Sequence, residues 1–527
     1  MNRRIFPLLA CATLLLLSCC TKDNDPRLVI ITYDGLRWQE LFEGADAALV
    51  SNPRYVKDTT ALKEAFWRDT PEERRLALMP FTWEYIVQHG YLIGNRNKGS
   101  QMQVANTKNF SYPGYSEMFC GYADDERIDS NDPTPNPNAN VLQAAFADPR
   151  YAGSVVVYGS WESIRYAVNN DTVGMPASVA YEPGVKGRRH SAVMQLIDEM
   201  QDGMPHYWGS ERFDAFTYAY ALETLKGDHP KVMWIAFGDT DEWGHDGKYD
   251  TYLKSVHGTD AFVRRIVETC ESDPFYRGRT TYLMTCDHGR GRRGGFSDHG
   301  SGTKGSEQTW FIAFGKGVEA LGELADNGPF YTQQFASNVA EVLGISFTPD
   351  NGVQQQPIRP DFRGEPLKDE EEQIEKGHFD ALKGVKSQHQ GVRYTYHEGE
   401  VKSVDELDSL AVKKRGVLPN FRFDDAKVSD YFGFQYKALL KVEKDGRYHI
   451  MCSSDDGTKV WLDGQLILDN DGAHGTSWVE AFADLEAGFH RLEVKYFQKT
   501  GGKVLDLTWE GPGFSETAIP DSVLYLE

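Results

Sequence analysis

Carboxylates and imidazoles gather in a few short segments of this 527-residue chain. Three aspartates and three histidines form the set: Asp34, Asp241, His245, Asp287, His288 and His299. Mixed carboxylate and imidazole donors without thiolates suit Zn²⁺, and other divalent ions such as Mn²⁺ also accept them. A single aspartate of this kind could simply cap a helix. Three aspartates with three histidines nearby predict a metal site instead.

The aspartates follow apolar runs that predict buried strands. The runs cover residues 28–33, 154–158, 232–237, 281–285 and 310–314. Apolar runs without polar alternation are typical of parallel strands that are covered on both faces. Helix-like amphipathic stretches lie between them, for example residues 213–225 and 252–270. This order predicts an α/β domain, and because ligands bind at the carboxyl ends of parallel strands, the aspartates should converge there.

A candidate nucleophile stands in the motif Ser111-Tyr112-Pro113. Two further motifs hold the acids and histidines, DEWGH at 241–245 and CDHG at 286–289. With these motifs in this order, the segment from Leu28 to about Pro349 resembles the alkaline phosphatase superfamily, most closely its nucleotide pyrophosphatase/phosphodiesterase-like branch. The resemblance implies a mostly parallel sheet flanked by helices.

The resemblance also implies two metal ions and a role for each residue. One ion would be held by Asp241, His245 and His299. The other would be held by Asp34, Asp287 and His288, with Ser111 bound to it. The ions would be two Zn²⁺, with other divalent ions as alternatives, and they would activate Ser111 to form a phosphoserine intermediate. Asn131 falls where the branch places an asparagine that binds phosphate, although a loop asparagine that caps a turn is an alternative.

The chain departs from its relatives' patterns near the nucleophile. The branch usually has Asn-His after the proline, whereas this chain has Gly114-Tyr115, so leaving-group selectivity does not carry over. Sulfatases need an arginine where Tyr115 stands, which argues against conversion of Ser111 to formylglycine. Arg290, Arg292 and Arg293 could grip an anionic substrate or could form a solvated loop. Residues 171–211 are expected to build the substrate-binding wall.

The chain after residue 356 has a different composition. Residues 357–390 are charged and polar, and they predict a linker that is helical in part at most. Residues 391–527 show short alternating segments broken by Asp-Gly turns, a pattern that predicts an all-β sandwich. This module resembles the protective-antigen-type β-sandwich, a possible carbohydrate-binding module. In some relatives the counterparts of Asp455 and Asp456 bind Ca²⁺ and a sugar, and a purely structural turn is the alternative.

The N-terminus has the features of a bacterial lipoprotein signal. Residues 1–18 combine two arginines with an apolar run, and Cys19 follows in a lipobox-like setting. Residues 19–27 then read as a polar tether to a catalytic domain over residues 28–356. The expected location is the bacterial cell envelope, lipid-anchored at Cys19, either periplasmic or on the cell surface. A net charge of −22 argues against nucleic-acid polymers as partners.

Together these features predict an exported, lipid-anchored, two-metal hydrolase of phosphoesters, with a glycan as a second partner. Three alternatives stay open: a phospho-group transferase of the same superfamily, a sulfatase-like hydrolase, and an inactive glycan-binding protein. The motifs do not decide between monoesters and diesters, because that choice depends on variable loops around the second ester group.

Overall fold

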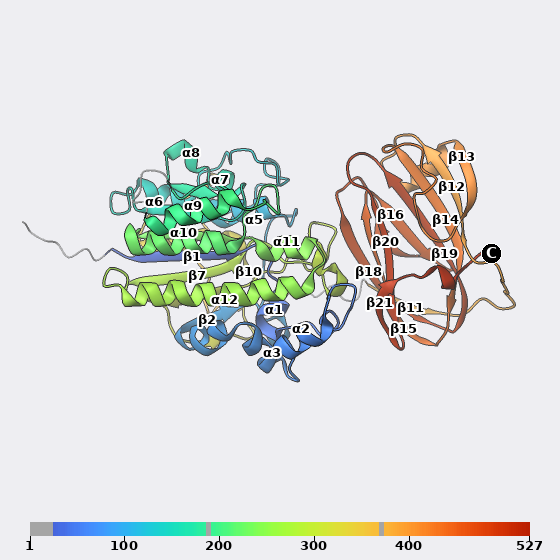
Figure 1. Ribbon diagram of the computed structural model, residues 1–527, viewed down its shortest axis with the longest axis horizontal. Helices are drawn as coiled ribbons and strands as arrows, with labels where there is room; N and C mark the ends of the chain where they lie inside the picture. Colours follow the sequence, from blue (N-terminus) through green and yellow to red (C-terminus); the bar gives the residue numbers. More distant parts are fainter. Residues whose placement is uncertain (1–24, 186–190, 368–373) are drawn as a thin grey trace, which may run out of the picture.

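The computed structural model describes residues 25–185, 191–367 and 374–527. The predicted signal peptide, Cys19 and the acidic run at 368–372 lie outside these residues. Figure 1 shows two domains side by side, an α/β domain that begins with β1 and an all-β domain that ends the chain. Within the described residues, no helix has both the length and the apolar character needed to cross a membrane.

An eight-stranded sheet forms the centre of the first domain, in the order β5-β4-β6-β1-β7-β8-β2-β9. The strands are β1 (Arg27–Tyr33), β2 (Gly90–Ile93), β4 (Val155–Gly159), β5 (Ala177–Val179), β6 (Val232–Phe237), β7 (Thr280–Cys286), β8 (Phe311–Gly315) and β9 (Gly322–Glu323). The pairs from β5 to β7 are parallel, and β8 runs antiparallel to both of its neighbours. The predicted α/β class with a mostly parallel sheet is confirmed.

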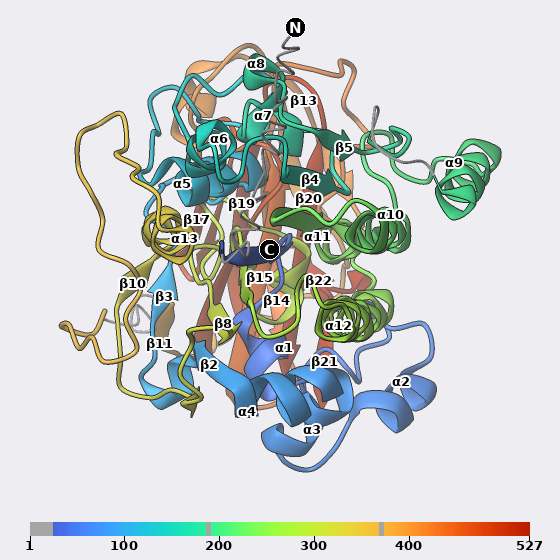
Figure 2. The ribbon, with the colours of Figure 1, turned by 90° about the vertical axis from the view of Figure 1, so that its left-hand side faces the viewer.

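Helices cover both faces of this sheet, which explains the uninterrupted apolar runs. Val29 and Ile31 of β1 belong to one core, while Leu28 and Ile30 belong to the other. The helices are α1 (Trp38–Glu43), α2 (Thr59–Phe66), α3 (Pro71–Leu78), α4 (Val87–His89), α5 (Ser111–Cys120), α6 (Val141–Ala147), α7 (Ile164–Ala167), α8 (Asn170–Val173), α9 (Ala192–Gly203), α10 (Asp214–Gly227), α11 (Asp239–His245), α12 (Tyr249–Ser272) and α13 (Phe335–Leu343). Helices α10 and α12 pack on the first core and α5, α6 and α13 on the second (Figure 2).

Two sheets packed face to face make the second domain, so the predicted β-sandwich is confirmed. Their orders are β11-β18-β15-β20-β21 and β13-β12-β14-β19-β16-β17, with β22 paired to β14. The strands are β11 (Glu375–Phe379), β12 (Val392–Glu398), β13 (Val412–Leu418), β14 (Phe432–Val442), β15 (Gly446–Asp455), β16 (Thr458–Leu462), β17 (Gln465–Asn470), β18 (Ser477–Leu485), β19 (Gly488–Gln498), β20 (Val504–Gly511), β21 (Phe514–Ala518) and β22 (Leu524–Tyr525). Their inward side chains form one core.

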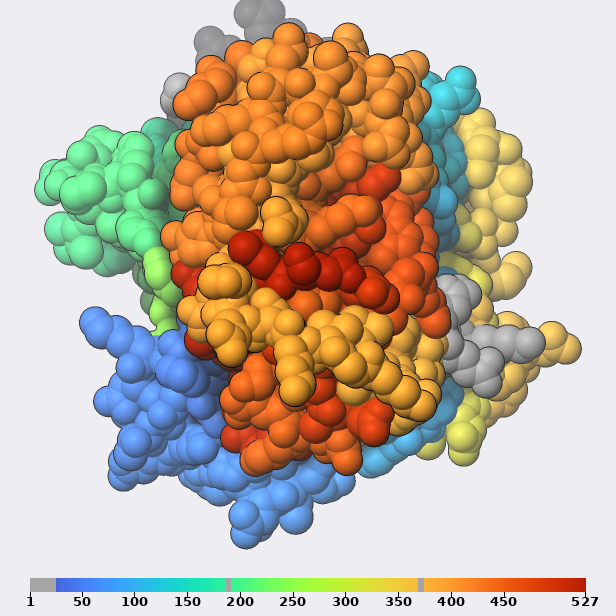
Figure 3. All heavy atoms as spheres, turned by 90° about the vertical axis from the view of Figure 1, so that its right-hand side faces the viewer, coloured from blue at the N-terminus to red at the C-terminus, as the bar shows by residue number. Residues whose placement is uncertain are grey.

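The segment expected to be a linker, residues 357–390, contributes to this sandwich. Its strand β11 pairs in parallel with β18, at the edge of one sheet. The end of the chain lies along the same region, because Leu526 N donates to His389 O and Gly391 N donates to Leu524 O. Figure 3 shows these terminal residues crossing the outer face of the domain. The expectation of a linker without strands therefore needs correction: pairing with β18 satisfies the backbone groups of residues 375–379, which the polar composition did not indicate.

Candidate metal centre and active site

Three neighbouring strands bring the predicted aspartates to one edge of the sheet. Asp34 follows β1 and Asp287 follows β7, while Asp241 lies in α11, directly after β6. Strand β1 pairs with both β6 and β7, so the three carboxyl ends are adjacent. The three aspartates therefore converge at one edge of the sheet, as expected from the sequence.

The first candidate group contains Asp34, Asp287 and His288, whose ligand atoms all lie within 4.8 Å of one another. His288 Nε2 is 3.3 Å from Asp34 Oδ1 and 3.6 Å from Asp287 Oδ2. All three side chains are buried. Asp287 Oδ1 accepts a hydrogen bond from Gly35 N, whereas its buried Oδ2 has no hydrogen-bond partner among the described residues.

The charges in this group are not balanced by the protein. Burial and the negative charge of Asp34 raise the pKa of Asp287 well above its usual value. Burial and the charge of Asp241 raise the pKa of Asp34. Burial opposes protonation of His288, but Asp287 and Asp34 raise its pKa to about 9. Buried carboxylates that face one another, one with an orphaned oxygen, fit a divalent cation.

The second candidate group contains Asp241, His288 and His299, again within 4.8 Å. His245 Nε2 lies 3.1 Å from Asp241 Oδ2 and 3.0 Å from His299 Nε2. The side chain of His245 is 43% exposed, so this part of the site opens to solvent. All six predicted residues therefore meet, but His288, and not the predicted His245, completes the second group of three and is shared between the two groups.

Arg290 is built into the second group. Its buried guanidinium forms an ion pair with Asp241 and donates to the carbonyls of Phe296 and Ser297. Burial opposes it, but the charges of His245 and Arg290 lower the pKa of Asp241 well below its usual value. Because Arg290 is fully engaged inside the protein, it does not fit the suggested role of gripping an anionic substrate.

Ser111 lies beside both groups as the first residue of α5. Its Oγ donates to Asp34 Oδ1 at 3.2 Å and lies 3.1 Å from His288 Nε2. Asn131 is close by: its side-chain oxygen accepts a hydrogen bond from Tyr112 N at 2.9 Å, and the residue is exposed. The start of a helix favours bound anions, because free N–H groups and the helix dipole point toward them.

Two buried residues, Tyr115 and Glu211, make contacts at the site that were not predicted from the sequence. Tyr115, one turn after Ser111, donates its hydroxyl to Asp34 Oδ2 at 3.2 Å. The i, i+4 spacing from the nucleophile could have indicated this contact. Glu211 is buried with an unpartnered Oε1, and a Cβ at Gly238 would lie 1.7 Å from that oxygen. Burial and the charge of Glu242 raise its pKa well above the usual value.

The stretch expected to build the substrate wall, residues 171–211, contains β5 and α9 and ends at Glu211. Glu211 bridges to Trp161 after β4, which brings the end of this stretch to the carboxyl edge of the sheet. No sequence motif marks Glu211, because the contact depends on this long-range pairing.

The predicted calcium or glycan pair lies in the other domain, at the end of β15. Asp456 is buried, with Oδ1 accepting from His474 N at 3.0 Å and Oδ2 from Lys499 N at 2.6 Å. Among the described residues, neither aspartate belongs to a group of three possible metal ligands. The hydrogen bonds from these two backbone N–H groups to Asp456 thus hold two loops together.

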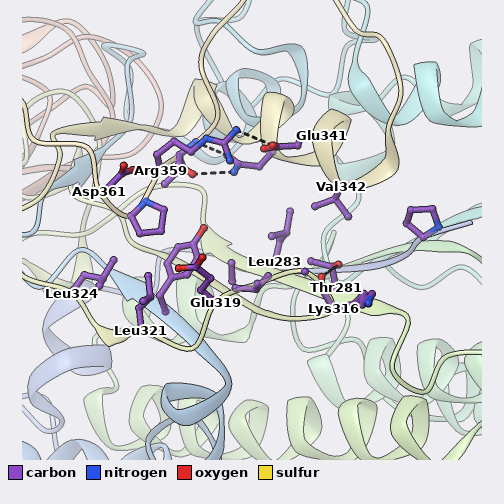
Figure 4. A pocket seen from close by; sticks show the side chains of 18 of the residues that line it. Thr281, Leu283, Lys316, Glu319, Leu321, Leu324, Glu341, Val342, Arg359 and Asp361 are labelled. Carbon is purple, nitrogen blue, oxygen red and sulfur yellow. Dashed lines mark hydrogen bonds and ion pairs between the residues drawn. The ribbon is translucent and has the colours of Figure 1, made fainter.

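A separate cavity of about 850 Å³ lies over strands β7, β8 and β2, away from both metal groups. Figure 4 shows its apolar side chains, among them Leu283, Leu324 and Val342, and the ion pair of Arg359 with Glu341 beside them. None of the predicted site residues lines this cavity.

Family models match a segment in each of the two domains. Residues 214–326 match the Metalloenzyme superfamily, a stretch that contains five of the six candidate ligands. Residues 391–522 match the PA14 domain, so the C-terminal sandwich is a PA14 domain. These matches confirm the resemblance to the alkaline phosphatase superfamily and to the protective-antigen-type module, while the nucleotide pyrophosphatase branch stays a prediction. No curated protein matches the chain.

Solved structures give low-identity matches. One is a protein of the alkaline phosphatase superfamily from Vibrio parahaemolyticus (14% identity, TM-score 0.38), covering 62% of this chain and 69% of that one. Another is described as a sulfatase from Bacteroides thetaiotaomicron (11% identity, TM-score 0.41), covering 63% and 73%. A third is an anti-sigma factor domain-containing protein (21% identity, TM-score 0.23), covering 26% and 48%. The chain thus spans about half the length of that third protein.

Proposed function

We propose that this protein, with a metalloenzyme-superfamily segment and a C-terminal PA14 domain, is a metal-dependent phosphoester hydrolase with Ser111 as its nucleophile. One observation carries the proposal: Ser111 Oγ lies at the start of α5, within 3.2 Å of Asp34 and 3.1 Å of His288, each a member of a candidate ion-binding group. A nucleophile beside two such groups suits in-line displacement at phosphorus.

The ions would be held by the six residues already described, with Zn²⁺ the expected metal. When bound, they would lower the pKa of the Ser111 hydroxyl and neutralise the phosphate oxygens. Tyr115 orients Asp34 by donating to its second oxygen. The positive end of the α5 helix dipole lies beside Ser111 and would favour the negative charge of the substrate's non-bridging oxygens.

The chain's residues account for the bonds that form and break. Ser111 Oγ gives up its proton and attacks phosphorus, while the bond to the alcohol leaving group breaks. The alcohol departs with that proton, which leaves phosphoserine. Water then attacks phosphorus, the bond to Ser111 Oγ breaks, and Ser111 takes up a proton from that water. Asn131, close to Ser111 at the start of α5, is placed to donate to a phosphate oxygen.

Sulfate esters are the competing substrate class. In place of the arginine of the sulfatase motif stands Tyr115, which is buried and engaged with Asp34. An unmodified Ser111 favours phosphoesters. The PA14 domain supports a glycan as second partner, and the sequence of residues 1–19 supports a lipid anchor at Cys19 in the cell envelope; both belong to the proposal.

The test is hydrolysis of p-nitrophenyl phosphate, bis-p-nitrophenyl phosphate and p-nitrophenyl sulfate by the full chain with Zn²⁺. Ser111→Ala should lower phosphoester turnover by at least about a thousandfold, because it removes the proposed nucleophile. The matched control is Ser116→Ala on the same helix, whose Oγ accepts from Asn136 instead of facing the ions. Turnover of the sulfate alone would contradict the proposal, as would full activity in Ser111→Ala.

A further inference from the structure

The PA14 domain covers the loop that carries several site residues. We call residues 290–303 the ligand loop, since it contains Arg290 at one end and His299 near the other. The outer face of the β18-β15-β20-β21 sheet packs on this loop, as the position of β18 against the α/β domain shows (Figure 1). Trp478, in β18, is only 4% exposed at this contact.

Three glycines of the ligand loop are fitted to PA14 side chains. A Cβ at Gly295 would lie 2.6 Å from the Trp478 ring, and one at Gly302 would lie 2.3 Å from Ser477 Oγ. A Cβ at Gly294 would lie 2.5 Å from the hydroxyl of Tyr55, in the α/β domain, and within 2.7 Å of both carboxylate oxygens of Glu516. None of the three has a positive φ, so the absence of space explains the glycines, without any unusual backbone conformation.

Polar contacts lock the same interface. Tyr55 donates its hydroxyl to Glu516 Oε1 at 2.7 Å, and both residues are buried. Arg54 pairs with Asp506, and Arg293 of the ligand loop pairs with Glu510. Of these contacts, the pair of Arg293 with Glu510 holds the ligand loop itself, while Tyr55 and Arg54 join the PA14 sheet to the segment before α2. The buried pair of Tyr55 with Glu516 indicates a packed interface, because domains that share only a linker would not bury such groups at their contact.

Two short series of contacts connect the PA14 domain with the candidate ligands. Beside Gly295, the carbonyls of Phe296 and Ser297 accept from Arg290, which is paired with Asp241. In the other series, Trp478 N donates to Thr303 Oγ1 at 3.3 Å.

Backbone bonds tie the loop into one unit. Thr303 N donates to the carbonyl of Gly300, the residue after His299, and Asp298 N donates to Gly295 O. The loop cannot shift at Gly295 or Thr303 without moving Arg290 or His299.

We propose that Trp478, through its ring against Gly295 and through its backbone N–H bonded to Thr303, is a positioning residue for the ion-binding site, so that the PA14 domain forms part of that site's support. The inference rests on the proposed binding of metal by this site, and it does not depend on which ester the enzyme cleaves. Residues that orient metal ligands from outside typically change affinity by about 10- to 100-fold when they are removed.

The experiment compares Trp478→Ala with Trp461→Ala in the full chain. Trp461→Ala is the same substitution in the same domain. Trp461 lies in β16 of the other sheet, where it packs beside Val401 and Leu407. Zn²⁺ affinity is measured by competition with a chromophoric chelator, and the absorption spectrum of the Co²⁺-loaded protein reports ligand geometry. Hydrogen exchange of residues 290–303 reports the loop.

We expect Trp478→Ala to weaken Zn²⁺ binding about tenfold, to alter the Co²⁺ spectrum and to speed exchange in the ligand loop. Trp478→Phe, which keeps a ring against Gly295, should restore most of the affinity. If Trp478→Ala fails to fold, Thr303→Val decides, since it removes only the acceptor for Trp478 N and should still weaken binding.

The proposal is overturned if loop exchange rises in Trp478→Ala while Zn²⁺ affinity and the Co²⁺ spectrum match those of Trp461→Ala. It is also overturned if Thr303→Val binds Zn²⁺ as the parent chain does. A parent chain that binds Zn²⁺ but hydrolyses no phosphoester would refute the proposed function and leave this inference standing.

Discussion

Two acidic pairs, one in each domain, have different surroundings. Asp34 and Asp287 face each other and His288 in a buried group, and one carboxylate oxygen there has no hydrogen-bond partner. In the PA14 domain, Asp456 gives both of its oxygens to the backbone N–H groups of His474 and Lys499. A carboxylate that the backbone already satisfies has less to offer an ion than one left facing other negative charges.

The contrast teaches how to separate candidate metal sites from structural carboxylates. Acidic residues in the sequence indicate only that oxygen ligands are available. Uncompensated charge in the folded protein indicates that a cation is needed. On this criterion the buried groups of the α/β domain are the candidate ion sites, whereas Asp456 primarily joins two loops of the sandwich.

The strongest test of this difference is to substitute one aspartate in each domain. Asp287→Asn should weaken Zn²⁺ binding by about 100-fold or more, because it removes an anionic ligand from a buried group. Asp455→Asn should leave Zn²⁺ affinity unchanged. Isothermal titration of the full chain measures both. Equal losses in the two variants would show that the pairs do not differ as described.

A smaller effect is expected from Asp456→Ala. Two backbone N–H groups would lose charged acceptors, at a cost of about 2 kcal/mol to the stability of the PA14 domain. Asp455→Ala is the control, because no hydrogen bond of its carboxylate compares with those of Asp456. Thermal unfolding of the full chain with and without millimolar Ca²⁺ measures the effect. A large stabilisation of the parent chain by Ca²⁺, lost in both variants, would instead make the pair a calcium site.

The smallest expected effect concerns Glu211, whose pKa is raised by burial and by the charge of Glu242. A raised pKa in the folded state means that ionisation of Glu211 costs stability, and this cost grows as pH rises through that pKa. Glu211→Gln should therefore stabilise the chelator-treated protein by about 1 kcal/mol at pH 8 and by less at pH 5. Glu242→Gln, at a less buried position, should do less. Reduced Zn²⁺ affinity in Glu211→Gln would instead show that Glu211 is a metal ligand.

Much of the α/β domain could be predicted from its sequence. The apolar runs over residues 28–33 and 232–237 match β1 and β6 closely, because strands covered on both faces need apolar side chains throughout. Asp34, Asp287 and His288 come directly after strands, Asp241 lies in the helix that follows β6, and a parallel sheet brings such positions to one edge. Their meeting in space was therefore foreseeable, whereas their roles as ligands stay a prediction.

The remainder depends on contacts between distant segments. Arg290 stands in the chain as a loop arginine, and only the fold reveals that it pairs with Asp241. Strand β11 lies in a charged, polar segment, and its pairing with β18 joins residues about a hundred positions apart. Periodicity within one segment cannot report which other segment will complete its hydrogen bonds.

The close contact between glycines of the ligand loop and PA14 side chains limits which substitutions the two domains can accept during evolution. At Gly295 and Gly302, the side chains of the PA14 domain leave no space for a Cβ atom, and neither glycine has a positive φ. A related catalytic domain without a PA14 partner has no packing reason to keep glycine at these positions. The two domains are therefore expected to be inherited, exchanged or lost together with the sequence of this loop.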